Sequence, residues 1–443
     1  MSDTEQRLSI WDAKNNLTYD QPLEPGDDKF VDLAPARGEF NLQRLYSQLN
    51  VDNQGNLHKP PLKQYILFTG HRGCGKSTEL LRIADHLHDP KRYYVVHLDC
   101  LETLDINNLK YSDVLLALAA ALLKKLETQH GISMEQVHLS RLENWYKERV
   151  VTHSKLRSME AELKAGIKTK TGLPWLVELF AELTNKISIG STYRDELREV
   201  VRNNFTEFSD SFNQLIRAAE DKVRAQHLGE RILFTVDGTD RLDSEDAHKF
   251  FIDDVHQLTQ IQSLFIYCAP INLLRASNQL NASFGQTIRV PMLKVRDRDN
   301  QAIEANYATV RELVYHRVPD YLFDDVATLN YLIQYSGGHP RDLLRLLNIA
   351  IANQDNELID RVAAERAVKE LASDYRRIIN SKEYERLVAI DNTPDAPDEF
   401  TDEVSNTMLY NLILLEYNDY YWKSHPVITT LAGYKKAALE AGV

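Results

Sequence analysis

Short apolar runs separated by amphipathic stretches dominate the chain up to residue 300. Five of these runs have the length and the β-branched or aromatic content of buried strands, and they lie at residues 65–69, 93–100, 231–237, 263–270 and 287–291. Helical spacing follows the first run at 78–84 and the second at 111–128. Strands alternating with helices predict an α/β fold built on a parallel sheet.

From residue 301 onward the apolar positions keep helical spacing. Four helices are predicted, at 302–318, 329–335, 342–354 and 359–375. We interpret residues 301–375 as a helical lid. Two further helices, at 383–390 and 403–412, precede two predicted strands at 413–417 and 420–423. This order predicts a small winged-helix-like domain over residues 376–443.

The polar residues 1–30 contain Pro22, Pro25 and Gly26, so we expect an N-terminal arm or a strap over the first domain rather than a core element. The predicted core spans residues 31–300. Its first segment, 31–49, combines a loop with a leucine-spaced helix and would help to cover the base of a bound nucleotide.

Residues 132–226 interrupt the strand pattern and are mostly helical in spacing. We interpret them as a helical insertion in the core. It would be either a partner-binding or oligomerisation arm or a helical hairpin that packs on the core. The run Trp175–Phe180 inside it is short and has no basic face, so no membrane contact is expected.

Composition narrows the class of protein. The chain has 443 residues, of which 43% are hydrophobic and 26% charged, as in an ordinary globular protein. Its three cysteines lie far apart, which argues against a disulfide framework or a zinc site and fits a reducing cytoplasm. No secretory signal is recognisable at the N-terminus, and the longest apolar run, Val114–Leu123, is too short to span a bilayer. The net charge of −13 argues against a surface that binds nucleic acid throughout.

Gly70–Ser77 fits the phosphate-binding pattern G-x-x-x-x-G-K-[ST] at every fixed position, between a predicted strand and a predicted helix. Its glycines let successive N–H groups turn toward one phosphate. Lys76 would reach the β- and γ-phosphates, and the Ser77 hydroxyl would bind Mg²⁺. The sequence contains no guanine-reading Asn/Thr-Lys-x-Asp motif, so ATP is the expected nucleotide.

The strand at 231–237 delivers Asp237 to the carboxyl edge of the sheet, where ligands bind in open α/β folds. This fits a Walker B strand, in which Asp237 holds Mg²⁺ opposite Ser77. Asp240, or as a second choice Asp243, would orient or deprotonate the attacking water. Alternatively, Asp240 is a charge at a helix N-terminus near the site. Asn272, after the fourth strand, would line the mouth of the site.

Between two lid helices, the turn Ser336–Asp342 carries Gly337 and Gly338, which allow a tight bend. Arg341, at the start of the following helix, would reach the γ-phosphate and report it to the lid, unless it is simply a surface arginine. The catalytic candidates are therefore Lys76, Asp237, Asp240 and Arg341. The candidate nucleotide contacts are Gly70, His71, Arg72, Gly73, Cys74, Gly75, Lys76, Ser77, Thr78, Pro340 and Arg341.

Together, the Gly70–Thr78 loop, the Asp237-Gly238-x-Asp240 sequence, the Gly337–Arg341 turn and the C-terminal segment resemble the AAA+ and STAND group of P-loop ATPases, allied to prokaryotic origin-recognition initiators. Gly238 stands where a typical AAA+ Walker B has glutamate, so the resemblance implies slow hydrolysis that depends on Asp240. No arginine lies between Asn278 and Gln286, where an arginine finger would be sought.

The STAND resemblance implies a nucleotide-controlled switch that self-associates and regulates a separate effector protein, as in bacterial antiphage defence. The alternative is a DNA-binding ATPase of initiator or transposition-regulator type, but residues 373–443 carry seven Lys/Arg against twelve Asp/Glu, which disfavours phosphate-backbone binding. A scaffold that binds nucleotide without hydrolysing it is the third hypothesis.

Overall fold

We describe the protein from a computed structural model of the chain. The residues that it describes are 7–38, 40–107, 109–135, 141, 142, 144, 145, 148, 191–285, 287–354, 357–393, 397–417 and 421–442. The chain forms two compact units. The first, here called the lid unit, comprises Met1–Asn41, Gly70–Glu79 and Arg289–Val443, and the second, the sheet unit, comprises Leu42–Thr69 and Leu80–Ile288.

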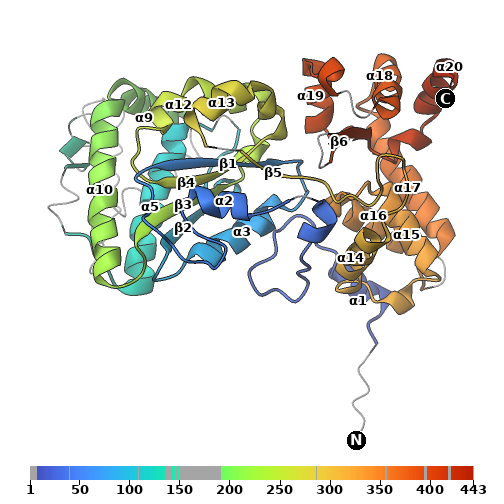
Figure 1. Ribbon diagram of the computed structural model, residues 1–443, viewed down its shortest axis with the longest axis horizontal. Helices are drawn as coiled ribbons and strands as arrows, with labels where there is room; N and C mark the ends of the chain where they lie inside the picture. The colour runs from blue at the N-terminus through green and yellow to red at the C-terminus, as the bar shows by residue number, and fades with distance from the viewer. Residues whose placement is uncertain are drawn as a thin grey trace, which may run out of the picture. The chain divides into compact units, whose positions relative to one another are not determined.

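A five-stranded sheet organises the sheet unit. Its strands are β1 (Gln64–Gly70), β2 (Tyr93–Asp99), β3 (Arg231–Asp237), β4 (Leu264–Ala269) and β5 (Ile288–Val290), in the spatial order β2-β3-β4-β1-β5 (Figure 1). The registered pairs β1–β4, β2–β3 and β3–β4 are all parallel. This is the α/β sheet of a P-loop NTPase fold, and the five predicted strands are confirmed.

The helical segments around this sheet are α2 (Gln43–Gln48), α3 (Lys76–Leu87), α4 (Cys100–Thr103), α5 (Tyr111–His130), α9 (Ser191–Asn203), α10 (Phe205–Ala225), η3 (Thr239–Arg241), α11 (Ser244–His248), η4 (Lys249–Asp253), α12 (Val255–Leu258), η5 (Ile271–Ala276) and α13 (Ser277–Ser283). Every residue of β3 and β4 is buried, as expected of parallel strands covered on both faces. Helix α5 packs on β2 and α10 on β3 (Figure 1).

Most of the described residues of the predicted insertion lie in two helices, α9 and α10, whereas residues 132–135 are not helical. Phe208 and Phe212, one turn apart on α10, are fully buried, and their ring centroids lie 5.7 Å apart in the core that covers the sheet. This helix therefore packs on the core, and the choice between a partner-binding arm and a hairpin packed on the core stays open for the insertion as a whole. The run Trp175–Phe180 lies outside the described residues.

The lid unit is mainly helical. Its segments are α1 (Ile10–Asn15), η1 (Ala34–Arg37), α14 (Glu304–Tyr315), η6 (Asp320–Leu322), α15 (Val326–Tyr335), α16 (Pro340–Ala352), α17 (Arg361–Arg376), α18 (Ser381–Asn392), η7 (Pro397–Phe400), α19 (Glu403–Tyr410), β6 (Leu414–Glu416), β7 (Trp422–Ser424), η9 (Ile428–Thr430) and α20 (Ala432–Ala441). Strands β6 and β7 form an antiparallel hairpin. The order helix, helix, hairpin is present, although the predicted turn at Asn418-Asp419 lies outside the described residues and α20 was not predicted. A winged-helix domain stays a prediction.

Helix α1 differs from the predicted extended arm. Ser9 and Asp12 form a capping box, in which Ser9 Oγ accepts from Asp12 N–H (3.2 Å) and Asp12 Oδ2 accepts from Ser9 N–H (3.1 Å). Ile10 and Ala13 are buried, and α1 packs against α16. The reciprocal cap, visible in the sequence, stabilises a short helix that the proline-rich context of residues 1–30 had obscured. Among the helices described, none is long and apolar enough to cross a membrane.

A buried ion pair fixes the starts of three strands in the sheet unit. Arg231, the first residue of β3, donates to Glu220 Oε1 on α10 (3.0 Å) and to the carbonyls of Leu62 (2.7 Å) and Gln262 (3.2 Å), which precede β1 and β4. Both side chains are at most 10% exposed, and burial raises the pKa of Glu220. Arg231 therefore depends on Glu220 for its counter-charge.

Replacing Glu220 by alanine leaves a guanidinium buried without its carboxylate, so we expect Glu220→Ala to lower the free energy of unfolding by about 3–5 kcal/mol in urea titrations. The matched control is Asp221→Ala on the same helix, since the Asp221 side chain is 74% exposed. This control should unfold like the wild type. Equal stability of the two variants would contradict the structural role of the pair.

Candidate functional site

The Gly70–Ser77 loop leaves β1 at the carboxyl edge of the sheet and enters α3 at Lys76. Gly73 and Gly75 have φ angles of +82° and +100°, in the left-handed region that favours glycine. Lys76 is only 4% exposed, and its Nζ donates to the carbonyl oxygens of Gly70 (2.9 Å) and His71 (2.8 Å). The strand–loop–helix context predicted for the motif is confirmed.

The remaining carbonyls of the loop also accept hydrogen bonds. Arg72 O accepts from His339 Nε2 (2.7 Å), and Gly73 O accepts from the backbone N–H of Arg341 (3.4 Å).

Further along the loop, Cys74 O accepts from Arg37 Nη2 (2.6 Å), and Gly75 O accepts from the N–H of Glu79 in the first turn of α3 (3.1 Å). In a trans peptide, the C=O and the following N–H point in opposite directions. Apart from the N–H of Cys74, which donates to His71 O (3.3 Å), the N–H groups of such a loop point away from the donors that hold its carbonyls, and this arrangement suits an anion.

Arg37 is a site residue that the sequence analysis did not single out. Its side chain is fully buried and holds two carbonyls, those of Cys74 in the loop and Pro291 after β5. Burial lowers its pKa from the usual arginine value. Its Nε is buried and has no hydrogen-bond partner among the described residues. The only feature of the sequence that could have pointed to Arg37 is its position in the loop before the leucine-spaced helix of segment 31–49.

His71, a candidate nucleotide contact, also has a side chain with a structural role. Its Nδ1 lies 3.1 Å from Leu409 O and its Nε2 accepts from Glu416 N–H (2.8 Å). Burial lowers the pKa of His71 to about 3, with Coulombic contributions from His339 and Lys76. The ring is therefore neutral at ordinary pH, with its proton on Nδ1, because only Nδ1 faces a carbonyl acceptor.

The predicted lid turn lies against the same loop. A Cβ at Gly73 would lie 2.8 Å from Arg341 Cβ and from His339 Nε2. Pro340 is the first residue of α16, where its missing N–H costs nothing, and His339 caps that helix. Arg341 Nε donates to Tyr19 O (3.3 Å). The structure thus places Arg341 beside Gly73 of the phosphate loop, whereas contact of Pro340 and Arg341 with a nucleotide stays a prediction.

Both glycines of the lid turn have positive φ, +62° at Gly337 and +73° at Gly338. A Cβ at Gly338 would lie 1.9 Å from Leu293 O, and one at Gly337 would meet Leu415 and Pro426 within 2.7 Å. These positions exclude any side chain. The bend predicted from the glycine pair is confirmed, and its packing adds a close approach to the C-terminal hairpin.

The sheet unit presents the acidic candidates. Asp237 is the last residue of β3 and its Oδ1 accepts from Gly238 N–H (2.7 Å). Its neighbour across the ladder is Asp99, the last residue of β2. Asp99 lies in the predicted strand at 93–100 and was not predicted to be a site residue. It caps α4 by accepting from Leu101 N–H (2.7 Å). Two carboxylates therefore end neighbouring strands at the ligand-binding edge.

Gly238 has φ +84°, and a Cβ there would lie 3.0 Å from Leu101 Cγ and 3.3 Å from Leu101 N. A glutamate at this position would be strained, which explains the departure from the AAA+ pattern. Asp240 follows in η3 and is 8% exposed, whereas Asp243 caps α11 through Asp246 N–H (2.8 Å). The capping role of Asp243 leaves Asp240 as the better candidate for positioning water.

Two further candidates complete the arrangement. Asn272 lies in η5 after β4, and its buried Oδ1 has no partner among the described residues. Thr78 Oγ1 accepts from Leu23 N–H (3.1 Å), so a hydroxyl of the loop helix holds the N-terminal segment. In the lid unit, the structure brings Arg341 next to Gly73 of the loop, and Lys76 holds the carbonyls of Gly70 and His71. Ser77 belongs to the lid unit and Asp237 to the sheet unit.

Comparisons with known proteins add little. No protein-family model and no curated protein matches this sequence. A Walker-type ATPase of Pyrococcus abyssi is similar in structure, with 14% identity, a TM-score of 0.41 and coverage of 94% of this chain and 99% of that one. Cdc6p from Pyrobaculum aerophilum has 12% identity, a TM-score of 0.37 and coverage of 97% and 98%. Scores this low say nothing about function, so the class rests on the chain itself, which has a P-loop NTPase fold.

The buried His71 ring makes stability depend on pH. Unfolded histidine binds a proton near pH 6.5, but folded His71 resists it until about pH 3, so stability is present above pH 6.5 and is lost as pH falls below it. One such proton contributes a slope of up to about 1.4 kcal/mol per pH unit. We expect His71→Gln to reduce the slope of unfolding free energy between pH 6 and 5, measured in urea. Exposed His256→Gln is the control, and equal slopes in wild type and His71→Gln would contradict this assignment.

Proposed function

We propose that this protein binds ATP with Mg²⁺ at the Gly70–Ser77 loop, hydrolyses it slowly, and uses the bound nucleotide as a switch that controls a partner protein. The observation that carries the proposal is the loop geometry. Every carbonyl from Gly70 to Gly75 accepts a hydrogen bond, and the loop runs directly into the first turn of α3, so that it ends at a helix N-terminus, which favours an anion. An anion is the natural occupant of such a loop.

The residues have distinct roles in this proposal. Lys76 would exchange its bonds to Gly70 O and His71 O for the β- and γ-phosphates. The Ser77 hydroxyl and the Asp237 carboxylate are hard oxygen donors that suit Mg²⁺, which neutralises phosphate charge when bound. Asp240 would orient the attacking water.

Slow turnover follows from the Walker B region. The left-handed, tightly packed Gly238 leaves no place for the glutamate that a typical AAA+ enzyme uses. Asp240, shorter and two residues further along, is the remaining carboxylate in η3. A nucleotide that stays bound for a long time suits a switch better than a motor.

Arg341 links the nucleotide to the lid in this proposal. Its backbone N–H already donates to Gly73 O, and its side chain starts within contact distance of the loop. Reaching a γ-phosphate would tie α16 to the nucleotide. The movement of the lid would then control self-association and the binding of an effector protein, both of which the STAND resemblance implies. A role in antiphage defence stays a prediction, as does the alternative of DNA binding.

Lys76→Ala removes the cation that faces the phosphates, so we expect ATP affinity to fall at least about 100-fold, or about 2.7 kcal/mol, with an unchanged circular dichroism spectrum. Asp240→Asn should keep ATP affinity and slow phosphate release about 100-fold or more. Exposed Lys91→Ala is the control for the first variant. Unaltered ATP affinity of Lys76→Ala, measured by calorimetry, would overturn the assignment.

The switch itself is tested by the mass of the purified protein, measured by light scattering with and without ATP and Mg²⁺ while phosphate release is followed in the same samples. We expect ATP to change the assembly and phosphate to appear slowly. A constant monomer that releases phosphate only when duplex DNA is added would replace the switch with the initiator-like alternative.

A further inference from the structure

A side-chain network joins the phosphate loop to the C-terminal hairpin of the lid unit. On one side, His71 donates from Nδ1 to Leu409 O in α19 and accepts at Nε2 from Glu416 N–H at the end of β6. Glu416 Oε2 in turn accepts from Trp422 Nε1 in β7 (3.0 Å), and Glu416 and Trp422 are ladder partners. His71, the residue after the first glycine of the phosphate loop, is therefore hydrogen-bonded directly to the hairpin.

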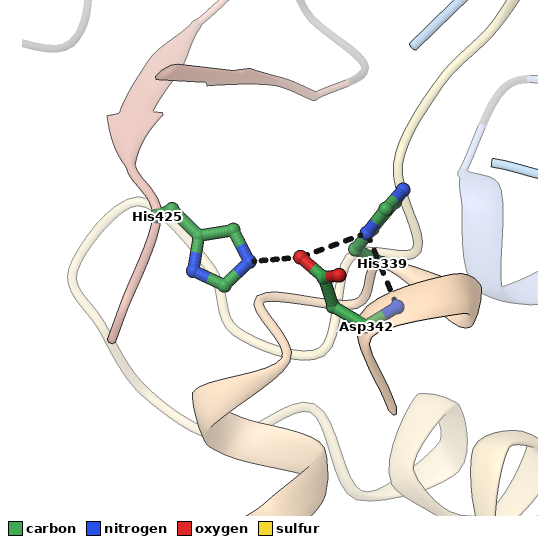
Figure 2. A group of neighbouring side chains, drawn as sticks. All are labelled: His339, Asp342 and His425. Atoms are coloured by element: carbon green, nitrogen blue, oxygen red, sulfur yellow. Dashed lines mark hydrogen bonds and ion pairs between the residues drawn. The ribbon is translucent and has the colours of Figure 1, made fainter. Parts of the chain in front are cut away.

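The second side of the network starts at the neighbouring loop residue. His339 Nε2 donates to Arg72 O, and His339 Nδ1 lies 3.2 Å from Asp342 Oδ2. His425, immediately after β7, places its Nε2 3.2 Å from the same oxygen. Figure 2 shows the Asp342 carboxylate between the two imidazole rings. His339, Asp342 and His425 are all at most 1% exposed.

The protons of this cluster can be assigned from its partners. His425 Nδ1 accepts from Val427 N–H (3.4 Å), and burial lowers the pKa of His425, so its single proton lies on Nε2, which is 3.2 Å from Asp342 Oδ2. Tyr375 Oη (2.8 Å) and Arg345 Nη1 (3.0 Å) also donate to the carboxylate. Burial alone would raise the pKa of Asp342, but His339 and His425 outweigh it and hold this pKa well below its usual range.

Two histidines and an aspartate are also metal ligands, but their bonding here opposes that reading. A metal at His425 Nε2 would require the proton on Nδ1, which faces a backbone N–H donor. Arg345 and Tyr375 already occupy the carboxylate. The cluster is therefore a buried polar bridge between α16 and His425 at the end of the hairpin, closed by the 3.2 Å approach of His425 Nε2 to Asp342 Oδ2.

The two sides close on adjacent residues of the phosphate loop, His71 and Arg72. We propose that this network, formed by His71, His339 and His425 with Asp342 and Glu416, positions the phosphate loop and transmits its occupancy to the β6–β7 hairpin. The inference rests on the proposed function, because it names the regulation of that same site. Its effect is reciprocal, since a hairpin that responds to nucleotide must also change the affinity for nucleotide.

The atom through which a nucleotide would act is Lys76 Nζ. It holds the carbonyls of Gly70 and His71, and a bound phosphate would draw it away from both. The released His71 peptide carries the ring that holds Leu409 and Glu416. Because that ring is buried on every side, a shift of the loop must either move the hairpin or break these bonds.

Trp422 provides the readout. The chain has four tryptophans, so full-length protein labelled with 5-fluorotryptophan gives few ¹⁹F resonances, and the one lost in Trp422→Phe is assigned to Trp422. We expect ATP with Mg²⁺ to shift this resonance with the same midpoint as ATP binding measured by calorimetry. ATP binding without any response of Trp422 would overturn the network proposal and leave the proposed function standing, whereas no ATP binding would overturn both.

His425→Phe keeps the stacking of this ring on Tyr375 (centroids 4.8 Å apart) but removes the ring nitrogen that lies 3.2 Å from Asp342 Oδ2. We expect it to change ATP affinity by about fivefold or more and to weaken the Trp422 response. His425→Gln retains an N–H donor and should restore both, which separates coupling from a simple packing defect. Tyr434→Phe, which removes a hydrogen bond to Asp391 elsewhere in the C-terminal segment, is the matched control and should behave as wild type.

Two results would contradict the network. Wild-type affinity and Trp422 response in a folded His425→Phe protein would show that the bridge does not couple the two sites. Stoichiometric zinc in the purified wild type, absent from His425→Phe, would show that the cluster is a metal centre and not a polar bridge. If His425→Phe fails to fold, Tyr375→Phe removes another donor to Asp342 and is subjected to the same two measurements, with the same expected direction.

Discussion

The satisfaction of the phosphate-loop carbonyls is the constraint on which the rest of the lid unit depends. A backbone that turns consecutive N–H groups to one side must direct its carbonyls to the other, and buried carbonyls need donors. Lys76 supplies two of these bonds from within the motif. Arg37, His339 and the N–H of Arg341 supply others from segments far away in the sequence. The N-terminal segment and the lid therefore hold the loop in its shape as well as lying beside it.

This constraint explains the glycines at the contact. Residue 73 must be a glycine because a Cβ there would lie 2.8 Å from Arg341 Cβ and from His339 Nε2. Residue 338 must be a glycine because a Cβ there would lie 1.9 Å from Leu293 O. Donors can reach loop carbonyls only if the backbones come together. The same close packing gives the lid a direct mechanical connection to the nucleotide site, which a longer, looser loop would lack.

The sheet unit contributes a different kind of order. Parallel strands β2 and β3 end in register, so Asp99 and Asp237 are neighbours at the ligand-binding edge. The left-handed turn at Gly238 then redirects the chain, and Asp240 follows at once. The sharp turn places the carboxylates of Asp237 and Asp240 near the end of β3. It also excludes a glutamate at Gly238, the position that follows Asp237.

By itself, the sequence determined the strands, most of the helices and the phosphate loop. Apolar periodicity and glycine spacing are local patterns, and they follow directly from which side chains a strand or a helix buries. Residues 10–15 were one exception, because a two-residue cap forms a helix in a segment predicted to be an arm, and the helix α20 at the C-terminal end was another. Only the tertiary structure decided which side chains serve the loop. Arg37, His339 and His425 are unremarkable in sequence, and their roles arise because folding brings buried donors to carbonyls and carboxylates tens or hundreds of residues away. No local pattern encodes that distance, because a hydrogen bond depends on position in space and not on separation along the chain.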